Sequence, residues 1–258
     1  MWDTEVDVLC VGAGIGGLAT AIAAADADAD VMIVTAGNES SAIDVGVSSV
    51  DLHSWLPVAV NDEDTDEYLA ALVNGFPETT EPVSQVVATR TPQEPETDLR
   101  TVPTFVGTGV ADWGSGCMHS LAGALFTTVR GWQVTEMHDA EGRRILVAPI
   151  GDMTWRAGQG IHTLKQALTA RVTELDIDVV FESPFLRLVF EGGAVVGAVF
   201  GGSDQEYAVG ARHGVVLAPD VALAVDAPVQ PESADRRVCL VSIPGSRFAR
   251  VELVDLPA

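Results

Sequence analysis

A glycine-rich motif near the amino terminus, Gly-Ala-Gly-Ile-Gly-Gly at residues 12–17, constrains the fold of this chain more than any other feature. It follows an apolar run over residues 6–11, as a loop follows a buried parallel strand. It precedes residues 18–27, whose alanine content favours a helix, and a second apolar run occupies residues 31–34. Strand, glycine loop, helix and strand within about 35 residues indicate a βαβ unit that binds a dinucleotide such as FAD or NAD.

Each glycine of the motif has a physical role. Gly12 lets the chain turn sharply off the strand, and Gly14 lets the backbone approach a pyrophosphate that a Cβ would obstruct. Gly17 lets the helix lie close to the sheet. The N–H groups at the helix start then face the phosphates, and the helix dipole favours their negative charge. The simpler alternative is a tight turn with small residues for packing, and it predicts the same fold.

The end of the second strand departs from the usual pattern. Dinucleotide-binding proteins carry Asp or Glu there to accept the ribose hydroxyls, whereas this chain has Thr35. A hydroxyl can hydrogen-bond a ribose but lacks the strength of a charge-assisted bond. Glu39 lies four residues further on, and only a loop that folds back would bring it to the ribose. The sequence therefore leaves two outcomes open, a nucleotide bound more weakly than usual or none bound.

Composition narrows the range of partners. Lys and Arg number 14 against 37 Asp and Glu, a formal net charge of −23, and such a field repels nucleic-acid backbones and anionic lipids. No apolar run approaches the roughly 20 residues of a membrane span, and the acidic start is unlike a signal peptide. We expect a cytoplasmic protein that binds neither nucleic acid nor membranes. The three cysteines are far apart, which argues against disulfides and a metal site.

The middle of the chain is less regular. Residues 63–73 are expected to form a short helix, and residues 79–101, rich in Pro, Thr, Glu and Gln, a loop or extended arm. The glycine-rich stretch over residues 107–119 is expected to be a loop that either lines a pocket or packs beside the core. Trp113 would offer that pocket a flat face. His119 in the same stretch is more typical of a structural or surface histidine than of a general base.

The second half of the chain alternates helix and strand before it turns antiparallel. Apolar residues at helical spacing predict a helix over residues 160–175, followed by a strand over residues 177–181. Glycine pairs then separate three expected antiparallel strands, at residues 185–190, 194–200 and 206–209. A final buried strand is expected over residues 214–218, and the chain ends with a β-hairpin around Pro244-Gly245-Ser246.

This order of elements resembles the fumarate reductase and succinate dehydrogenase flavoprotein family, which includes the 3-ketosteroid dehydrogenases. Four pieces carry the resemblance: residues 7–21, 160–181, 185–209 and 211–218. It implies an α/β fold, with a Rossmann-like, glutathione-reductase-type FAD-binding parallel sheet, an antiparallel β-meander and a reduced inserted cap region. The implied domains are an FAD-binding domain (1–50 and 158–222), an inserted cap or substrate region (51–157) and a C-terminal β-hairpin tail (223–258).

The resemblance also implies where FAD lies. The pyrophosphate would be held by the glycine loop, through Gly12, Ala13, Gly14, Gly16 and Gly17. Thr35 takes the place of the ribose acid, the backbone of Phe185 lies at the adenine, and Ala218 lies near the middle of the cofactor. Asp220 stands where the family has glycine, and the family's segment that closes over the flavin ring has no counterpart. The resemblance therefore assigns no catalytic residue.

Three functions are compatible with the sequence. The first is an FAD-binding oxidoreductase, or the flavoprotein subunit of one, acting on a CH–CH bond next to a carbonyl in a ketosteroid- or fumarate-like small molecule. The second is a non-catalytic subunit that binds a partner flavoenzyme or a second copy of itself, with cofactor binding weakened or lost; Thr35 and Asp220 favour it. The third is an NAD-binding module, against which the antiparallel meander argues.

Overall fold

The structure is a computed structural model of the chain, and one large sheet dominates it. It describes residues 1–37, 62–77, 88–93, 107–128, 134–155, 160–202, 205–219 and 236–255. The strands are β1 (Thr4–Val11), β2 (Val31–Val34), β3 (Ala88–Arg90), β4 (Gly123–Phe126), β5 (Thr135–His138), β6 (Arg144–Trp155), β7 (Asp178–Val180), β8 (Phe185–Glu191), β9 (Ala194–Gly201), β10 (Glu206–Leu217), β11 (Arg236–Ser242) and β12 (Phe248–Val254). All twelve join a single sheet.

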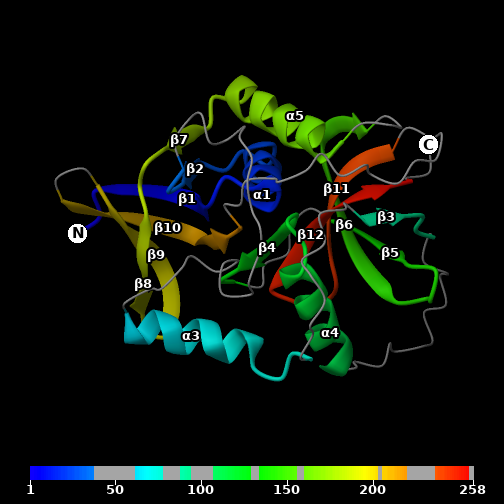
Figure 1. Cartoon of the computed structure of the whole chain (residues 1–258), viewed down its shortest axis with the longest axis horizontal. Helices are drawn as coiled ribbons and strands as arrows, with labels where there is room; N and C mark the ends of the chain where they lie inside the picture. Colours follow the sequence, from blue (N-terminus) through cyan, green and yellow to red (C-terminus); the bar gives the residue numbers. More distant parts are fainter. Residues whose placement is uncertain are drawn as a thin grey trace.

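The helices lie on both sides of this sheet. They are α1 (Ile15–Ala25), α3 (Glu63–Val73), α4 (Gly107–Met118) and α5 (Ile161–Glu174). Figure 1 shows α1 and α5 together above the sheet and α3 and α4 below it, and each pair packs into its own apolar core. Among the described helices, none is long and apolar enough to cross a membrane.

The first part of the sheet is parallel and confirms the expected Rossmann-like arrangement. Its strand order is β7-β2-β1-β10, with every neighbouring pair parallel. The predicted βαβ unit is present as β1, α1 and β2, and the predicted helix and strand of the second half are present as α5 and β7. Apolar side chains fill both faces of β2, which is buried throughout, as expected for a strand inside a parallel sheet.

The antiparallel meander is formed by β8, β9 and β10. The structure corrects the prediction of two separate strands at residues 206–209 and 214–218, because β10 runs without a break through both. Its first half pairs with β9, and from Val209 onward it pairs with β1, which begins at Thr4 and so reaches the meander. A register shift between Val6 and Val8, together with the positive φ of +133° at Gly214, lets the long strand bend as it passes β1.

An antiparallel extension completes the sheet. Beyond β10 the order is β4-β12-β11-β6-β5, and β3 adds to β12. The expected hairpin at the end of the chain is present as β11 and β12, and it lies between β4 and β6. The strands within residues 51–157 thus share a sheet with the FAD-type strands, while the domain boundaries stay a prediction. The expected loop over residues 79–101 contains β3; residues 79–87 and 94–101 lie outside the described residues.

Helix α4 corrects a second prediction, because the glycine-rich stretch was expected to be a loop. Glycine costs about 1 kcal/mol relative to alanine inside a helix, so local propensity opposes this helix. Packing explains it, since a Cβ on Gly114 would collide with the ring of Phe76 and lie 3.1 Å from that of Phe248. The absent side chain lets both rings lie against the helix backbone. The predicted helix α3 is confirmed, and its N-cap Asp62 accepts a hydrogen bond from the Thr65 N–H.

Candidate functional site

The glycine loop connects β1 to α1 and is hydrogen-bonded to the end of β2. Gly12 has a φ of +98°, which favours glycine, and its N–H donates to the Val34 carbonyl at 2.8 Å. The expected packing role of Gly17 is confirmed, because a Cβ there would collide with the Gly12 carbonyl oxygen and lie 3.3 Å from the Cβ of Ala218. Helix α1 therefore begins directly on the loop, and the whole loop is buried.

Close approach at the other two glycines involves the chain's own backbone. A Cβ on Gly14 would collide with the carbonyl oxygen of Pro219, just after β10, and a Cβ on Gly16 with that of Gly123, at the start of β4. The space that the sequence assigned to a pyrophosphate at Gly14 is thus lined on its Cβ side by Pro219. These two glycines are needed for packing whether or not a nucleotide is bound.

The amino end of α1 has the donor set that a phosphate requires. No side chain caps the helix at Gly14, and its first turn contains no acidic residue. The first N–H groups of a helix have no partner within it, and the positive end of the helix dipole lies beside them. Residues 15–17 thus supply N–H donors with no side chain competing from the N-cap, and the loop fits a pyrophosphate.

Thr35 holds the end of β2 in a defined turn. Its side chain is 3% exposed, and its Oγ1 accepts a hydrogen bond from the Gly37 N–H at 3.0 Å. Its backbone N–H donates to Val180, and its carbonyl accepts from the Ser183 N–H. The hydroxyl that stands in for the ribose acid is therefore already engaged in a local turn. Glu39 and Asp220, the two acids that the sequence singled out, lie outside the described residues.

The remaining cofactor candidates lie close to this turn and loop. Phe185 starts β8 two residues after Ser183, is 8% exposed, and packs edge-on against Phe200 with ring centroids 6.1 Å apart. Ala218 follows β10, and its N–H donates to the Val11 carbonyl at 2.9 Å. The structure thus gathers the glycine loop, Thr35 and Ala218 at the carboxyl ends of β1, β2 and β10. This edge is where open α/β sheets bind ligands.

Trp113 and His119, the two candidate pocket residues, both have packing partners near α4. The Trp113 Nε1–H donates to the Phe248 carbonyl at 3.0 Å, and the indole ring lies 4.9 Å from the Arg250 guanidinium. The His119 Nδ1 lies 2.8 Å from the Ser115 carbonyl oxygen, so that nitrogen carries a proton and donates. These contacts stabilise the helix and its attachment to β12, and a pocket at this stretch stays a prediction.

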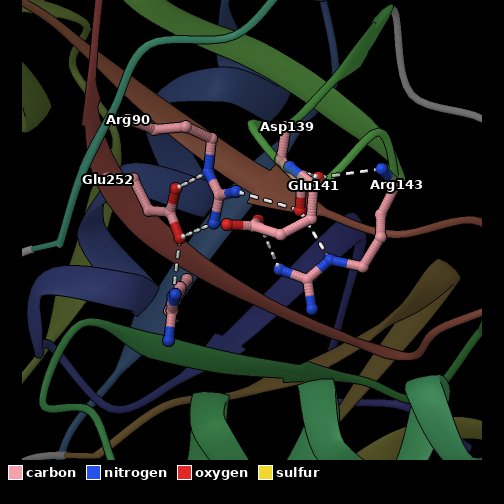
Figure 2. A network of polar contacts seen from close by, with 6 residues as sticks. Arg90, Asp139, Glu141, Arg143 and Glu252 are labelled. Carbon is pink, nitrogen blue, oxygen red and sulfur yellow. Dashed lines mark hydrogen bonds and ion pairs between the residues drawn. The ribbon is translucent and has the colours of Figure 1, made fainter.

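A buried ion-pair network near α4 was not anticipated from the sequence. Glu252 in β12 is completely buried and forms a two-point ion pair with Arg90 and a further bond to Arg250. Figure 2 shows Arg90 reaching from Glu252 towards Asp139, which lies 3.6 Å away and is 3% exposed. Asp139 is also bound by Arg143 at 2.7 Å, across the turn between β5 and β6.

The arginines keep both buried carboxylates ionised. Burial raises the pKa of Glu252, but the hydrogen bond from Arg90 and the charges of Arg250 and Arg90 outweigh it, so the pKa lies below its ordinary value. At Asp139, burial raises the pKa, but the hydrogen bonds and the charge of Arg143 outweigh it, so this pKa is also lowered. Paired carboxylates of low pKa are poor general bases, and this network serves to attach β3 and the β5–β6 hairpin to β12.

Comparison with known proteins agrees with this arrangement. A family model described as "FAD binding domain" matches residues 7–231, most of the chain. No curated protein matches the sequence. Solved structures to which this chain is similar include 3-ketosteroid-Δ4-(5α)-dehydrogenase from Rhodococcus jostii RHA1, with 19% identity, a TM-score of 0.37, and coverage of 83% of this chain and 46% of that one.

Two further solved structures have comparable similarity. The 3-ketosteroid Δ1-dehydrogenase from Sterolibacterium denitrificans is 16% identical, with a TM-score of 0.35, over 82% of this chain and 47% of that one. A flavocytochrome c3 fumarate reductase is 22% identical, with a TM-score of 0.34, over 81% of this chain and 33% of that one. This chain thus spans less than half of each of these proteins, and the similarity is too distant to indicate a substrate. By the family match, the chain belongs to the FAD binding domain family, whose cofactor is FAD.

Proposed function

We propose that this chain is the FAD-binding portion of a cytoplasmic oxidoreductase that acts on a CH–CH bond next to a carbonyl, in a small molecule such as a ketosteroid or fumarate. One observation carries the proposal. The uncapped amino end of α1 follows the glycine loop at the carboxyl ends of β1, β2 and β10, within the residues matched by the FAD family. The antiparallel meander before the end of β10 supports FAD over NAD.

The residues of this chain have distinct parts in such a site. The N–H groups of residues 15–17 bind the pyrophosphate, and the helix dipole stabilises its charge. Thr35 shapes the turn beside the ribose, and the backbone at Phe185 borders the adenine. FAD, when bound, supplies an acceptor for the hydride that leaves the substrate. The buried loop keeps water away from the phosphates, which strengthens their interaction with the N–H donors.

Titration of the purified full chain with FAD and with NADH tests the proposal. We expect FAD to bind one to one, with the absorbance bands of a protein-bound flavin, and NADH not to bind. A colourless protein that takes up no added FAD would contradict the proposal.

A matched pair of variants at Ala13 tests the position of the pyrophosphate. Ala13 is 6% exposed and lies in the glycine loop. Ala13→Glu places a negative charge beside the phosphates, and Ala13→Gln has nearly the same size without the charge. We expect the Glu variant to bind FAD at least about tenfold more weakly than the Gln variant, because like charges at close range cost more than 1.4 kcal/mol. Equal affinities, with circular dichroism unchanged, would place the pyrophosphate elsewhere.

A second candidate function is a non-catalytic subunit that stabilises a partner flavoenzyme. Two observations favour it: the Thr35 hydroxyl replaces an acid and already accepts from Gly37, and the Pro219 carbonyl lies against Gly14. This function requires a second polypeptide or a second copy of the chain. Size-exclusion chromatography of a native extract distinguishes the two functions, since a well-folded lone monomer that carries FAD would eliminate the subunit role.

A further inference from the structure

A cavity of about 590 Å³ lies at the end of α1 opposite the glycine loop. Its walls are the carboxyl end of α1, the middle of β6 and residues 213–216 near the end of β10. The volume lies within the range of about 300–1,000 Å³ that is typical of small-molecule sites. None of the residues that line it belongs to the candidate FAD site.

The cavity has an apolar floor, and the topology explains why space remains there. Strand β4 ends at Phe126, whereas the neighbouring β10 extends beyond it, so the sheet is incomplete at this point. Above the gap lie alanines from the end of α1 and the residues just after it, among them Ala23 and Ala27. Val8 and Val216 complete the floor with Phe126. A ligand body in contact with these residues would remove apolar surface from water.

The titratable side chains that line the cavity are three acids and one histidine, Asp7, Asp26, Asp28 and His213. Asp26 and Asp28 follow the carboxyl end of α1, and Asp7 lies opposite them on β1. The last turn of α1 contains no basic residue, so the negative end of the helix dipole adds to these charges. Asp7 accepts from Arg212 at 2.8 Å and Asp26 from Arg171 at 3.3 Å, whereas Asp28 has no side-chain partner among the described contacts.

We propose that this cavity binds an organic cation, a protonated amine attached to an apolar body. The ammonium group would lie at the mouth, where the Asp28 carboxylate accepts its hydrogen bond and the negative end of the α1 dipole favours its charge. The hydrocarbon body would lie on the floor formed by Val8, Phe126 and Val216. An anion of the same size would meet the unpartnered carboxylate of Asp28 and the negative end of a helix dipole, with a net charge of −23 on the whole chain. The charge of the ligand is therefore the selective feature of the site.

Three probes of equal length and different charge test this selectivity. Isothermal titration of the full chain with n-octylammonium, n-octanol and n-octanoate is performed at low ionic strength, because salt screens exposed charges. We expect n-octylammonium to bind at one site, and n-octanoate to bind at least about tenfold more weakly. Absence of n-octylammonium binding, or equal binding of the amine and the carboxylate, would overturn the proposal.

Variants locate the binding site within the chain. Ala23→Leu fills the cavity from the α1 side with three further carbons, at a position where leucine is a good helix former, and we expect a more than tenfold loss of n-octylammonium affinity with unchanged circular dichroism. Asp28→Asn removes the unpartnered charge and tolerates the φ of +61°, and we expect a loss of about two- to fivefold. The matched control, Asp178→Asn, removes an exposed acid on β7 outside the cavity and should leave the affinity unchanged.

The variants also give results that would overturn the proposal. Full affinity in folded Ala23→Leu would show that the amine binds outside the cavity. An equal loss in Asp28→Asn and Asp178→Asn would show a general attraction to an acidic surface rather than a site. FAD binding, followed by flavin absorbance in the same variants, reports on the glycine loop separately, because these residues lie at the other end of α1.

Discussion

The parallel and antiparallel halves of the sheet are stabilised in different ways. In the parallel half, β7-β2-β1-β10, apolar side chains are buried on both faces and glycines allow backbone segments to touch without side chains between them. In the antiparallel half, β4-β12-β11-β6-β5, a buried carboxylate, Glu252, lies within a strand and requires Arg90 from β3 and Arg250 from its own strand. One half depends on close backbone packing, and the other also depends on paired charge.

The two halves differ in the kind of contact rather than in its span along the chain. Distant segments meet in both, since Gly14 lies against Pro219 and Arg90 pairs with Glu252, 162 residues away. Removal of the buried ion pairs should affect the antiparallel half more than any single change in a surface charge. The two halves can be tested independently by substitutions that act on one of these kinds of contact at a time.

The largest effect should come from Glu252→Ala in the antiparallel half. The substitution leaves Arg90 and Arg250 without their main partner while they remain 14% and 22% exposed. Breaking a buried ion pair costs about 3–5 kcal/mol, and we expect the lower end because Asp139 remains near Arg90. The loss of stability is measured as the change in the free energy of unfolding in urea. The control, Glu141→Gln, removes an exposed partner of Arg143 and should change stability by less than about 1 kcal/mol. Equal losses in both variants would contradict the central role of Glu252.

In the parallel half, Gly14→Ala is the substitution that corresponds to Glu252→Ala, and we expect a smaller loss of stability. The new methyl group would collide with the Pro219 carbonyl, and overpacking of this kind costs about 1–3 kcal/mol. The control is Gly109→Ala in α4, where an added Cβ meets no atom within 4 Å and removal of a helical glycine stabilises by up to about 1 kcal/mol. Thermal unfolding without FAD separates this packing effect from cofactor loss. A melting temperature for Gly14→Ala equal to that of the unaltered protein would mean that Pro219 does not lie against the loop.

Acid should weaken the antiparallel half first. The pKa of Glu252 is lower in the folded protein than its ordinary value of 4.5, so the folded state binds this proton less readily than the unfolded state. Its contribution to stability is full above pH 4.5 and disappears as the pH falls through the lower, folded-state pKa. Hydrogen exchange between pH 6 and pH 3 should therefore show β12 and β3 losing protection before β1 and β2. Simultaneous loss in both halves would argue against the ion-pair network as the cause.

Features with a local sequence signal could be predicted, whereas features that depend on distant residues could not. Helix α3, helix α5 and the βαβ unit follow from local periodicity, and the position of the cofactor loop follows from glycine spacing. Helix α4 could not be predicted, because the advantage of Gly114 comes from the rings of Phe76 and Phe248. The role of Glu252 also has no local signal, since a single acid in an apolar strand does not indicate its partner. The cavity beneath α1 leaves only a weak trace, the run of small side chains at the end of the helix.

The smallest expected effect concerns α3, which packs beneath the meander and connects the two halves. The Asp62 carboxylate accepts from both the Thr65 N–H and the Thr65 hydroxyl, and that hydroxyl in turn accepts from the Leu188 N–H in β8. Asp62→Ala should cost about 1 kcal/mol, the usual value of an N-cap, whereas Asp62→Asn should cost less because it can still cap the helix. The pKa of Asp62 is lowered by its bond to Thr65, so any advantage of the wild type over Asp62→Asn should disappear as the pH falls through that pKa and the carboxylate becomes protonated. An advantage over Asp62→Asn that persists at pH 2 would mean that the charge of the side chain is not its source.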